Sequence, residues 1–263
     1  SINVRLFSYG SFNSPHKGYA RFIKLENKEQ LRQQVTVPMT IHIMAPEDRT
    51  GRGGDHIPFR QHSYTAMRFT SANEHGDAGV TNPNYTDRQH TTRDTLGMDT
   101  NNDQIVDSFF VDFNYLCRNA VINGNALAMC ALGPKQPDFS VTAFGVNNII
   151  VQITQQTQYG QYRVGIRTST HDWDTVHTMT NTLIDTIPVV PLSNNNVYVS
   201  VMSVDTDSIE SVPSVERVVN VSTTGEIVTS SSGIELMYNK PNPFDEATYL
   251  TFYSNVTGKK GVV

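Results

Sequence analysis

The sequence predicts an α/β unit followed by an all-β sandwich and a partial β domain, and three observations carry that prediction. Residues 2–70 order their apolar runs as strand, helix, strand, loop and strand, which is typical of an α/β sheet. Beyond residue 133 the apolar residues instead alternate with polar ones, which is typical of strands in a sandwich. A glycine and two prolines at 133–137 separate the two patterns. We therefore expect domains at 1–133, 134–221 and 222–263.

The α/β unit is expected to contain strands at 2–7, 40–44 and 66–69. Its first helix follows Asn13-Ser14-Pro15, which supplies an N-cap and a first-turn proline. A broad apolar stripe, starting after Gln104 and reaching Val121, predicts a long final helix whose aromatic residues belong to the core.

Both cysteines, Cys117 and Cys130, fall in this predicted final helix, where we expect them to be buried small apolar residues. A continuous helix would hold them about 20 Å apart, which is too far for a disulfide. A helix break at 123–125 would weaken that conclusion.

The sandwich is expected to have roughly seven strands, of which four are clear in the alternation. These lie at 149–153, 162–167, 182–185 and 197–202. No helix pattern interrupts them. A polar cluster surrounds Trp173 in this region, and we interpret it as an exposed connecting loop rather than a metal site: His171, Asp172, Asp174 and His177.

Composition excludes several classes of protein. The 263 residues are 38% hydrophobic and 17% charged, as in ordinary globular chains, and the net charge of -5 provides no basic surface for nucleic acid or anionic membrane. No apolar run approaches the roughly 18 residues of a membrane-spanning helix. Serine and cysteine hydrolase signatures, Walker loops and dinucleotide-binding glycine patterns are also absent. The two ends suggest an internal piece of a longer polypeptide.

The stretch from residue 53 to residue 95 contains the candidate site. An imidazole serves as a zinc ligand when its second nitrogen has an acceptor, and Asp94 follows His90 closely enough to supply one. Alone, such a pair is more often a surface or capping histidine. The segments GGDHIPF, YTAMRFTSANE and QHTTRDTL, however, resemble in order and spacing the C-terminal part of the co-catalytic zinc aminopeptidases, of the leucyl aminopeptidase and glutamate carboxypeptidase type.

This resemblance implies a secreted exopeptidase with two zinc ions and a peptide substrate. It makes His90 a ligand of one zinc, lets Asp94 orient that ligand, and places Asp55 and His56 in a loop near the site. No catalytic residue is assigned, because the general-base glutamate and the other ligands of the family precede the matched part. Residues 1–50 contain no such set, and a catalytic zinc needs about three protein ligands. The chain alone is therefore expected to be inactive.

Two other acidic stretches have plainer explanations. The segment from Ser71 to Arg88 carries Asn73, Glu74, His75 and Asp77, which we interpret as a solvated loop. The run from Asp99 to Asp103 opens like a calcium hand but lacks its glycine and its glutamate, so helix capping is the better interpretation.

The C-terminal half resembles two secretion-related modules. The segment NVYVSVMSVDTDSIESVPS resembles a late strand of a fibronectin type III module, although the early tryptophan of that module is missing. The Pro-Asn-Pro-Phe run at 241–244 resembles the start of a C-terminal sorting domain of type IX secretion. The implied location is secreted or on the surface of a Gram-negative bacterium, with the type IX machinery as partner. The alternative is a non-catalytic surface protein that binds glycan or protein through its sandwich.

Overall fold

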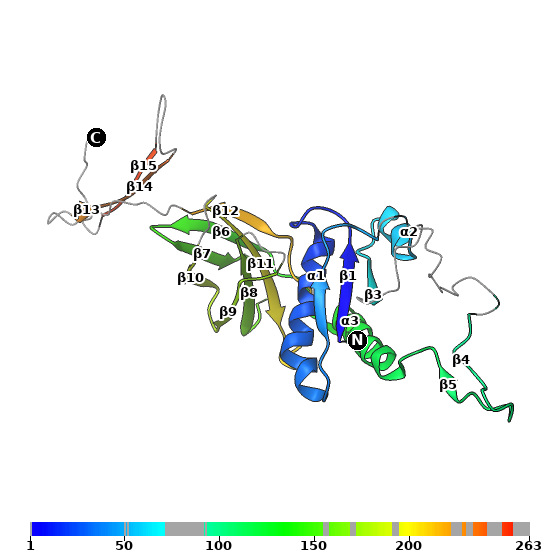
Figure 1. Ribbon diagram of the computed structural model, residues 1–263. Helices are drawn as coiled ribbons and strands as arrows, with labels where there is room; N and C mark the ends of the chain where they lie inside the picture. The colour runs from blue at the N-terminus through cyan, green and yellow to red at the C-terminus, as the bar shows by residue number, and fades with distance from the viewer. Residues whose placement is uncertain are drawn as a thin grey trace.

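The computed structural model describes residues 2–49, 51, 53–71, 92, 94–154, 158–168, 172–190, 195–221, 228–229, 234–240 and 249–254. Within these residues an α/β unit, residues 2–132, lies beside a β-sandwich, residues 139–221 (Figure 1). The order of elements confirms the β-sandwich that the alternating sequence pattern predicts.

The α/β unit is built on a three-stranded sheet in the order β2-β1-β3. The central strand β1 (Asn3–Ser8) runs parallel to β2 (Thr40–Ile43) and antiparallel to β3 (Met67–Ser71). Val4 and Leu6 are fully buried and pair with Ile41 and Ile43, so apolar residues of neighbouring strands share one face of the sheet.

Helix α1 (Pro15–Glu26) connects the two parallel strands. It begins where the sequence predicts, because the Ser14 side chain accepts from the Lys17 backbone N–H and Pro15 occupies the first turn. The helix continues as a π-turn (Asn27–Leu31) and a 3₁₀ turn (Arg32–Gln34). A short helix, α2 (His56–Gln61), follows the loop after β2.

The last helix of the unit, α3 (Phe113–Leu132), starts later than the sequence pattern predicts. Residues before it form a hairpin of β4 (Gly97–Met98) and β5 (Ser108–Phe109). The Asp99 carboxylate accepts hydrogen bonds from four backbone N–H groups of the hairpin loop, those of Asn101, Asn102, Asp103 and Gln104. The helix-capping interpretation of this run was therefore wrong, because the aspartate closes a hairpin turn.

The prediction that the apolar stripe of the last helix, with its aromatic residues, is core was also wrong. Only Ile122 and Ala126 of the helix are buried, and both pack with α1 on the same face of the sheet. Phe113 is 45% exposed and Leu116 is 53% exposed. Cys117 and Cys130 share this continuous helix, as expected, but both are exposed.

The sandwich consists of a three-stranded and a four-stranded antiparallel sheet, in the orders β10-β7-β6 and β12-β11-β8-β9. Its strands are β6 (Phe139–Phe144), β7 (Asn148–Ile153), β8 (Gln161–Arg167), β9 (Thr175–Thr180), β10 (Ile184–Pro188), β11 (Asn196–Val204) and β12 (Arg217–Asn220). Inward residues of both sheets, among them Ile149, Val164 and Val199, are fully buried in one cluster.

A further three-stranded sheet follows the sandwich, in the order β13-β14-β15, with strands Val228–Thr229, Ile234–Lys240 and Tyr249–Ser254. The Pro-Asn-Pro-Phe run at 241–244 lies outside the described residues. No helix in the described part of the chain is long and apolar enough to span a membrane.

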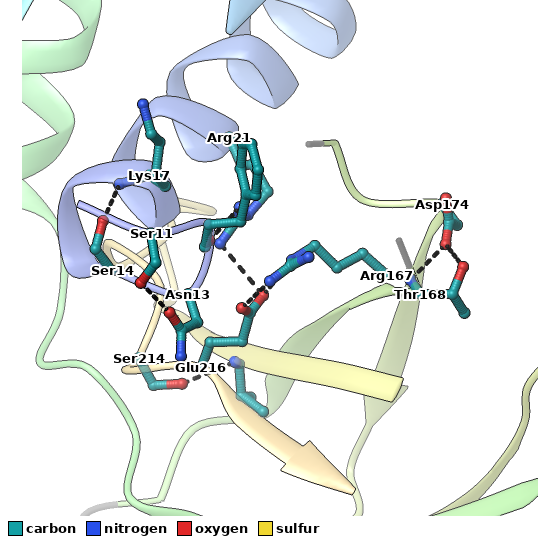
Figure 2. A network of polar contacts seen from close by, with 12 residues as sticks. Ser11, Asn13, Ser14, Lys17, Arg21, Arg167, Thr168, Asp174, Ser214 and Glu216 are labelled. Atoms are coloured by element: carbon teal, nitrogen blue, oxygen red, sulfur yellow. Dashed lines mark hydrogen bonds and ion pairs between the residues drawn. The ribbon is translucent and has the colours of Figure 1, made fainter. Parts of the chain in front are cut away.

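A buried ionic cluster holds the sandwich against α1, and we call it the joint (Figure 2). Glu216, with its side chain 2% exposed, accepts from the guanidinium groups of both Arg21 on α1 and Arg167 on β8. Glu216 Oε1 lies 3.2 Å from Arg21 Nη2 and 2.8 Å from Arg167 Nε. Phe22 and Leu25 of α1 also pack with the sandwich residue Met202.

Asp172, Trp173 and Asp174 lie in the connection between β8 and β9, as the sequence predicts, but only Asp174 of the three is exposed, and His177 lies on β9. Asp172 pairs with Lys24 of α1, and the Trp173 ring lies so close to Gly165 that an added Cβ would be 2.4 Å from the ring. Asp174 accepts from Thr168, and His177 pairs with Asp185. These partners account for the described members of the cluster without a metal, and His171 lies outside the described residues.

Candidate functional site

Asp55 and His56 lie at the edge of the sheet where the parallel strands β1 and β2 end. The loop from Met44 to Asp55 leaves β2, and α2 begins at His56. Arg60 of α2 stacks over the ring of Tyr9, 4.4 Å from its centroid, directly beyond β1. The carboxyl ends of parallel strands are where α/β folds commonly place their sites.

His56 is buried, with 6% of its surface exposed. Its Nε2 lies 3.1 Å from the Glu47 carbonyl oxygen, so the tautomer protonated at Nε2 donates to the loop backbone. The other ring nitrogen, Nδ1, is buried without a hydrogen-bond partner. It faces Gly54, where an added Cβ would lie 2.8 Å from Nδ1 and 3.0 Å from an Arg68 nitrogen. Glycine at 54 is therefore required for the imidazole to lie flat against the loop.

Two arginines hold the carboxylates of the same loop. Arg60 donates from Nε and Nη2 to the two carboxylate oxygens of Glu47, at 2.7 and 3.1 Å. Arg68 of β3 binds both oxygens of Asp48, at 3.1 and 3.2 Å, and also donates to the Gly53 carbonyl. The Arg60–Glu47 pair is bidentate, which fixes its orientation, whereas a single Arg68 nitrogen serves both Asp48 oxygens. Together the two pairs connect the loop after β2 to α2 and β3.

Lys17 connects the ends of β1 and β2 at the same edge of the sheet. Its fully buried ammonium donates to the Ser8 carbonyl at the end of β1 and to the Met44 carbonyl after β2, both at 2.6 Å. Burial, with the positive charge of Arg21 as a smaller cause, lowers the pKa of Lys17 to about 8. The lysine therefore fixes the spacing of the two strand ends from which the loop departs.

The described residues do not by themselves hold a zinc ion. No group of three or more histidine, cysteine or acidic side chains suited to a metal occurs among them. The predicted ligand His90 lies outside the described residues. Asp94 is exposed, and no hydrogen bond or ion pair within the described part of the chain joins it to Asp55 or His56. The orphaned Nδ1 of His56 and the Arg68 guanidinium border the same space beside Gly54, and the positive charge of Arg68 makes that space unfavourable for a cation.

A separate cavity of about 460 Å³ lies between the α/β unit and the sandwich. Its wall includes Tyr19 of α1, Cys130 of α3 and the segment from Val212 to Glu216. Ser200 of β11 also lines it, and the Ser200 hydroxyl is buried without a partner. The cavity belongs to the joint and is distinct from the loop that carries Asp55 and His56.

Several of these groups carry no signal in the sequence that would have identified them. Lys17 and Arg21 are ordinary helix residues in the pattern, and only the fold brings them to strand ends and to Glu216. One pattern in the sequence does point to the ion pairs of the loop. Two acidic residues, Glu47 and Asp48, follow a predicted strand directly, and arginines at 60 and 68 can balance their charge.

Comparison with known sequences identifies similar fungal proteins, whereas no family model matches the chain. A protein named "Probable zinc metalloprotease" from Pyrenophora tritici-repentis is 26% identical over 163 residues, 62% of this chain and 31% of that protein. One of the same name from Pyrenophora teres f. teres is 27% identical over 215 residues, 79% of this chain and 40% of that protein. A third, from Leptosphaeria maculans, is 33% identical over 133 residues, 51% of this chain and 27% of that protein. The chain thus spans well under half the length of these relatives.

Solved structures resemble the chain only weakly. A β-1,2-glucanase from Parabacteroides distasonis matches 35% of this chain and 14% of its own, at 16% identity and a TM-score of 0.26. A fibronectin type III-like protein from Clostridium thermocellum matches 35% of this chain over its whole length, at 16% identity and a TM-score of 0.25. These scores support no inference about function, and the strand order itself defines the sandwich.

Proposed function

We propose that this chain is the C-terminal part of a secreted zinc-dependent aminopeptidase, which hydrolyses N-terminal peptide bonds with a metal-activated water. The observation that carries the proposal is the 27% identity over 215 residues to a protein named as a probable zinc metalloprotease. That match spans 79% of the chain, so it extends beyond the short motif at residues 53–95.

His90 is the zinc ligand in this proposal, and Asp94 orients it. Two zinc ions would lower the pKa of a bound water and stabilise the developing oxyanion. The remaining ligands and the general base come from polypeptide that precedes residue 1 in the longer protein. The chain by itself therefore binds no catalytic zinc and cleaves no peptide.

In this proposal the loop from Glu47 to His56 positions the site and does not itself contact the substrate. Arg60 and Arg68 neutralise Glu47 and Asp48, so neither carboxylate is left as a competing metal ligand. His56 and Lys17 anchor the ends of the loop. Fixed positions for the described ends of the loop favour a positioned metal site.

Secretion by the type IX pathway of a Gram-negative bacterium is part of the same proposal. It rests on the Pro-Asn-Pro-Phe run at 241–244 and the alternating residues that follow it. The sandwich is a module carried with the peptidase.

The test is zinc content by elemental analysis together with hydrolysis of leucine-p-nitroanilide, on the complete polypeptide and on its His90→Ala variant. We expect about two zinc ions per chain in the unmodified enzyme. In the variant both zinc content and activity fall, because one ion loses a protein ligand. The 263-residue chain alone is expected to show neither.

His177→Ala is the matched control. It also removes a histidine, but one that pairs with Asp185 on the sandwich, far along the chain from the motif. Zinc content and activity of this variant should equal those of the unmodified enzyme. A complete polypeptide without zinc or peptidase activity would contradict the proposal and leave a non-catalytic surface protein as the better account.

A further inference from the structure

The cavity between the α/β unit and the sandwich has the size of a small-molecule site. Its volume is about 460 Å³, and pockets that enclose small ligands measure roughly 300–1,000 Å³. Such pockets occur preferentially where two structural units meet, and α1 packs against the sandwich here. None of the described residues in its wall takes part in the proposed zinc site.

The wall of the cavity is mostly apolar and carries no unbalanced charge among the described residues. Its apolar and aromatic residues come from α1 and from the segment before β12, namely Pro15, Gly18, Tyr19, Val212, Pro213 and Val215. Glu216 is the one charged residue of the described wall, and arginines donate to both of its carboxylate oxygens (Figure 2). A charged ligand would lose its hydration without gaining a partner, so the wall favours an uncharged molecule.

One polar side chain of the wall has no hydrogen-bond partner within the described residues. Ser200 of β11 is fully buried, and its hydroxyl is unpaired. Successive side chains of a strand point to opposite faces, and Val199 and Val201 point into the core of the sandwich. Ser200 therefore points to the other face, where Met202 packs against α1. A buried hydroxyl without a partner is unfavourable, and a polar group in the cavity would satisfy it.

Hydrogen bonds fix two walls of the cavity in place. The Tyr19 hydroxyl of α1 donates to the Ala126 carbonyl of α3 at 2.8 Å. On the sandwich side, the Val201 backbone N–H donates to the Ser214 hydroxyl at 2.9 Å. A preformed pocket loses little conformational freedom when a ligand binds, which favours affinity.

Cys130 marks the place where the cavity meets the surface. It lines the cavity and is also exposed. Cys117, on the same continuous helix, is exposed as well but does not belong to the wall. The helix holds the two residues about 20 Å apart. A molecule in the cavity would therefore cover the Cys130 thiol and leave the Cys117 thiol free to react.

We propose that this cavity binds a small, uncharged and largely apolar molecule that carries one hydroxyl or carbonyl group. The apolar part lies between α1 and the segment 212–216, and the polar group forms a hydrogen bond with the Ser200 hydroxyl. Asp55 and His56 lie outside the wall, so binding here is independent of the proposed zinc site.

A pair of serine substitutions tests the polar contact in the complete polypeptide. The probes are 2-naphthol, which is uncharged at neutral pH and has one hydroxyl, and naphthalene, which has none. Ser200→Ala should weaken the binding of 2-naphthol about three- to tenfold, the value of one net hydrogen bond, and leave that of naphthalene unchanged. Isothermal titration calorimetry measures both dissociation constants.

Ser203→Ala is the matched control for this substitution. Ser203 also lies on β11 and is fully buried with an unpaired hydroxyl within the described residues, but it is not part of the wall. Its loss should change neither dissociation constant. The inference would be overturned by the absence of 2-naphthol binding, or by equal affinities for 2-naphthol in the two variants.

Filling the cavity is the second test. An added Cβ at Gly18 would meet only Pro213 Cγ among the described atoms, at 3.8 Å, which is an ordinary contact. Gly18→Leu should therefore fold and, by occupying the space, weaken 2-naphthol binding at least about tenfold. Gly124→Leu, at a glycine of α3 with no described atom within 4 Å of an added Cβ, should bind as the unmodified protein does. Undiminished binding by a folded Gly18→Leu variant would contradict the proposal.

Thiol protection shows where the probe lies without any substitution. Iodoacetamide modification of Cys130 and Cys117 in the complete polypeptide can be followed for each peptide by mass spectrometry. At about ten times its dissociation constant, 2-naphthol should slow the modification of Cys130 about tenfold. The rate at Cys117 should not change. Equal slowing of both thiols, or of neither, would place the probe elsewhere and overturn the inference.

Discussion

The sandwich and the α/β unit differ in how completely they bury their apolar residues. In the sandwich, both sheets contribute fully buried residues to one cluster, and each sheet covers the other. In the α/β unit, two helices share one face of a three-stranded sheet, and the outer face of α3 remains exposed. Within the described residues, the sandwich therefore buries its apolar side chains more completely than the α/β unit does.

The joint holds α1 of the α/β unit against the sandwich, although the outer face of α3 in the same unit is exposed. Arg21, Arg167 and Glu216 are almost fully buried, and they connect α1 directly to β8 and to the segment before β12. Burial lowers the pKa of Arg21 to about 10, and Glu216 opposes this by stabilising the charged form. The sandwich, whose core is buried between its own two sheets, thus holds α1 of the less completely buried α/β unit. Three tests, taken from the largest expected effect to the smallest and each with its comparison, probe this contrast.

Glu216→Ala should have the largest effect. It leaves two buried guanidinium groups without their shared carboxylate, and breaking a buried pair in this way costs about 3–5 kcal/mol. Unfolding in urea, followed by the fluorescence of the single tryptophan, Trp173, reports on the joint directly.

Asp185→Ala is the control for this substitution, because it removes the carboxylate of the more exposed His177–Asp185 pair. Exposed pairs contribute about 0–1 kcal/mol, so its midpoint should hardly move. If Glu216→Ala were as mild as this control, the joint would not hold α1 in place.

Ile149→Ala and Leu127→Ala compare the two cores. Ile149 is fully buried between the sheets, so its truncation should cost about 3 kcal/mol of unfolding free energy. Leu127→Ala should change the stability of the 263-residue chain by less than about 0.5 kcal/mol, because the side chain is already exposed. Urea titrations of both variants give the comparison. A similar loss in both would mean that α3 is already covered within this chain.

Much of the fold followed from local patterns in the sequence. Alternation identified β1, β7, β8 and β11, and Ser14-Pro15 identified the start of α1, because these signals depend on neighbouring residues only. The start of α3 was misplaced because Ile105 and Phe109 match a helical period yet lie in a hairpin that Asp99 closes. Apolar spacing shows which residues seek burial, but not whether the partner for that burial lies in the same stretch of chain.

The candidate site was predictable only as a location. The GGDH motif placed Asp55 and His56 after a strand, and they lie there. The contacts of His56 with Glu47, and of Lys17 with Ser8 and Met44, join residues far apart in the sequence, which no spacing rule links. The roles predicted for His90 and Asp94 remain predictions, since His90 lies outside the described residues.

Glu26→Gln should have a smaller effect than Glu216→Ala or Ile149→Ala, and a pH-dependent one. Glu26 is the last residue of α1, only 4% exposed, and burial together with the negative charge of Glu210 raises its pKa to about 7, while Arg163 acts in the opposite direction. A carboxyl whose folded pKa exceeds its unfolded value stabilises the fold fully below about pH 4.5 and loses that contribution as the pH rises through about 7.

The glutamine variant removes the cost of ionising this buried carboxyl. It should therefore be more stable than the unmodified chain at pH 8, by about 1–2 kcal/mol, and equal to it or slightly less stable at pH 5. Thermal unfolding of both proteins at the two pH values measures the difference. Some pH dependence should remain in the variant, because burial also raises the pKa of Glu210. An equal gain at both pH values would show that the ionisation of Glu26 is not what lowers the stability of the chain at pH 8.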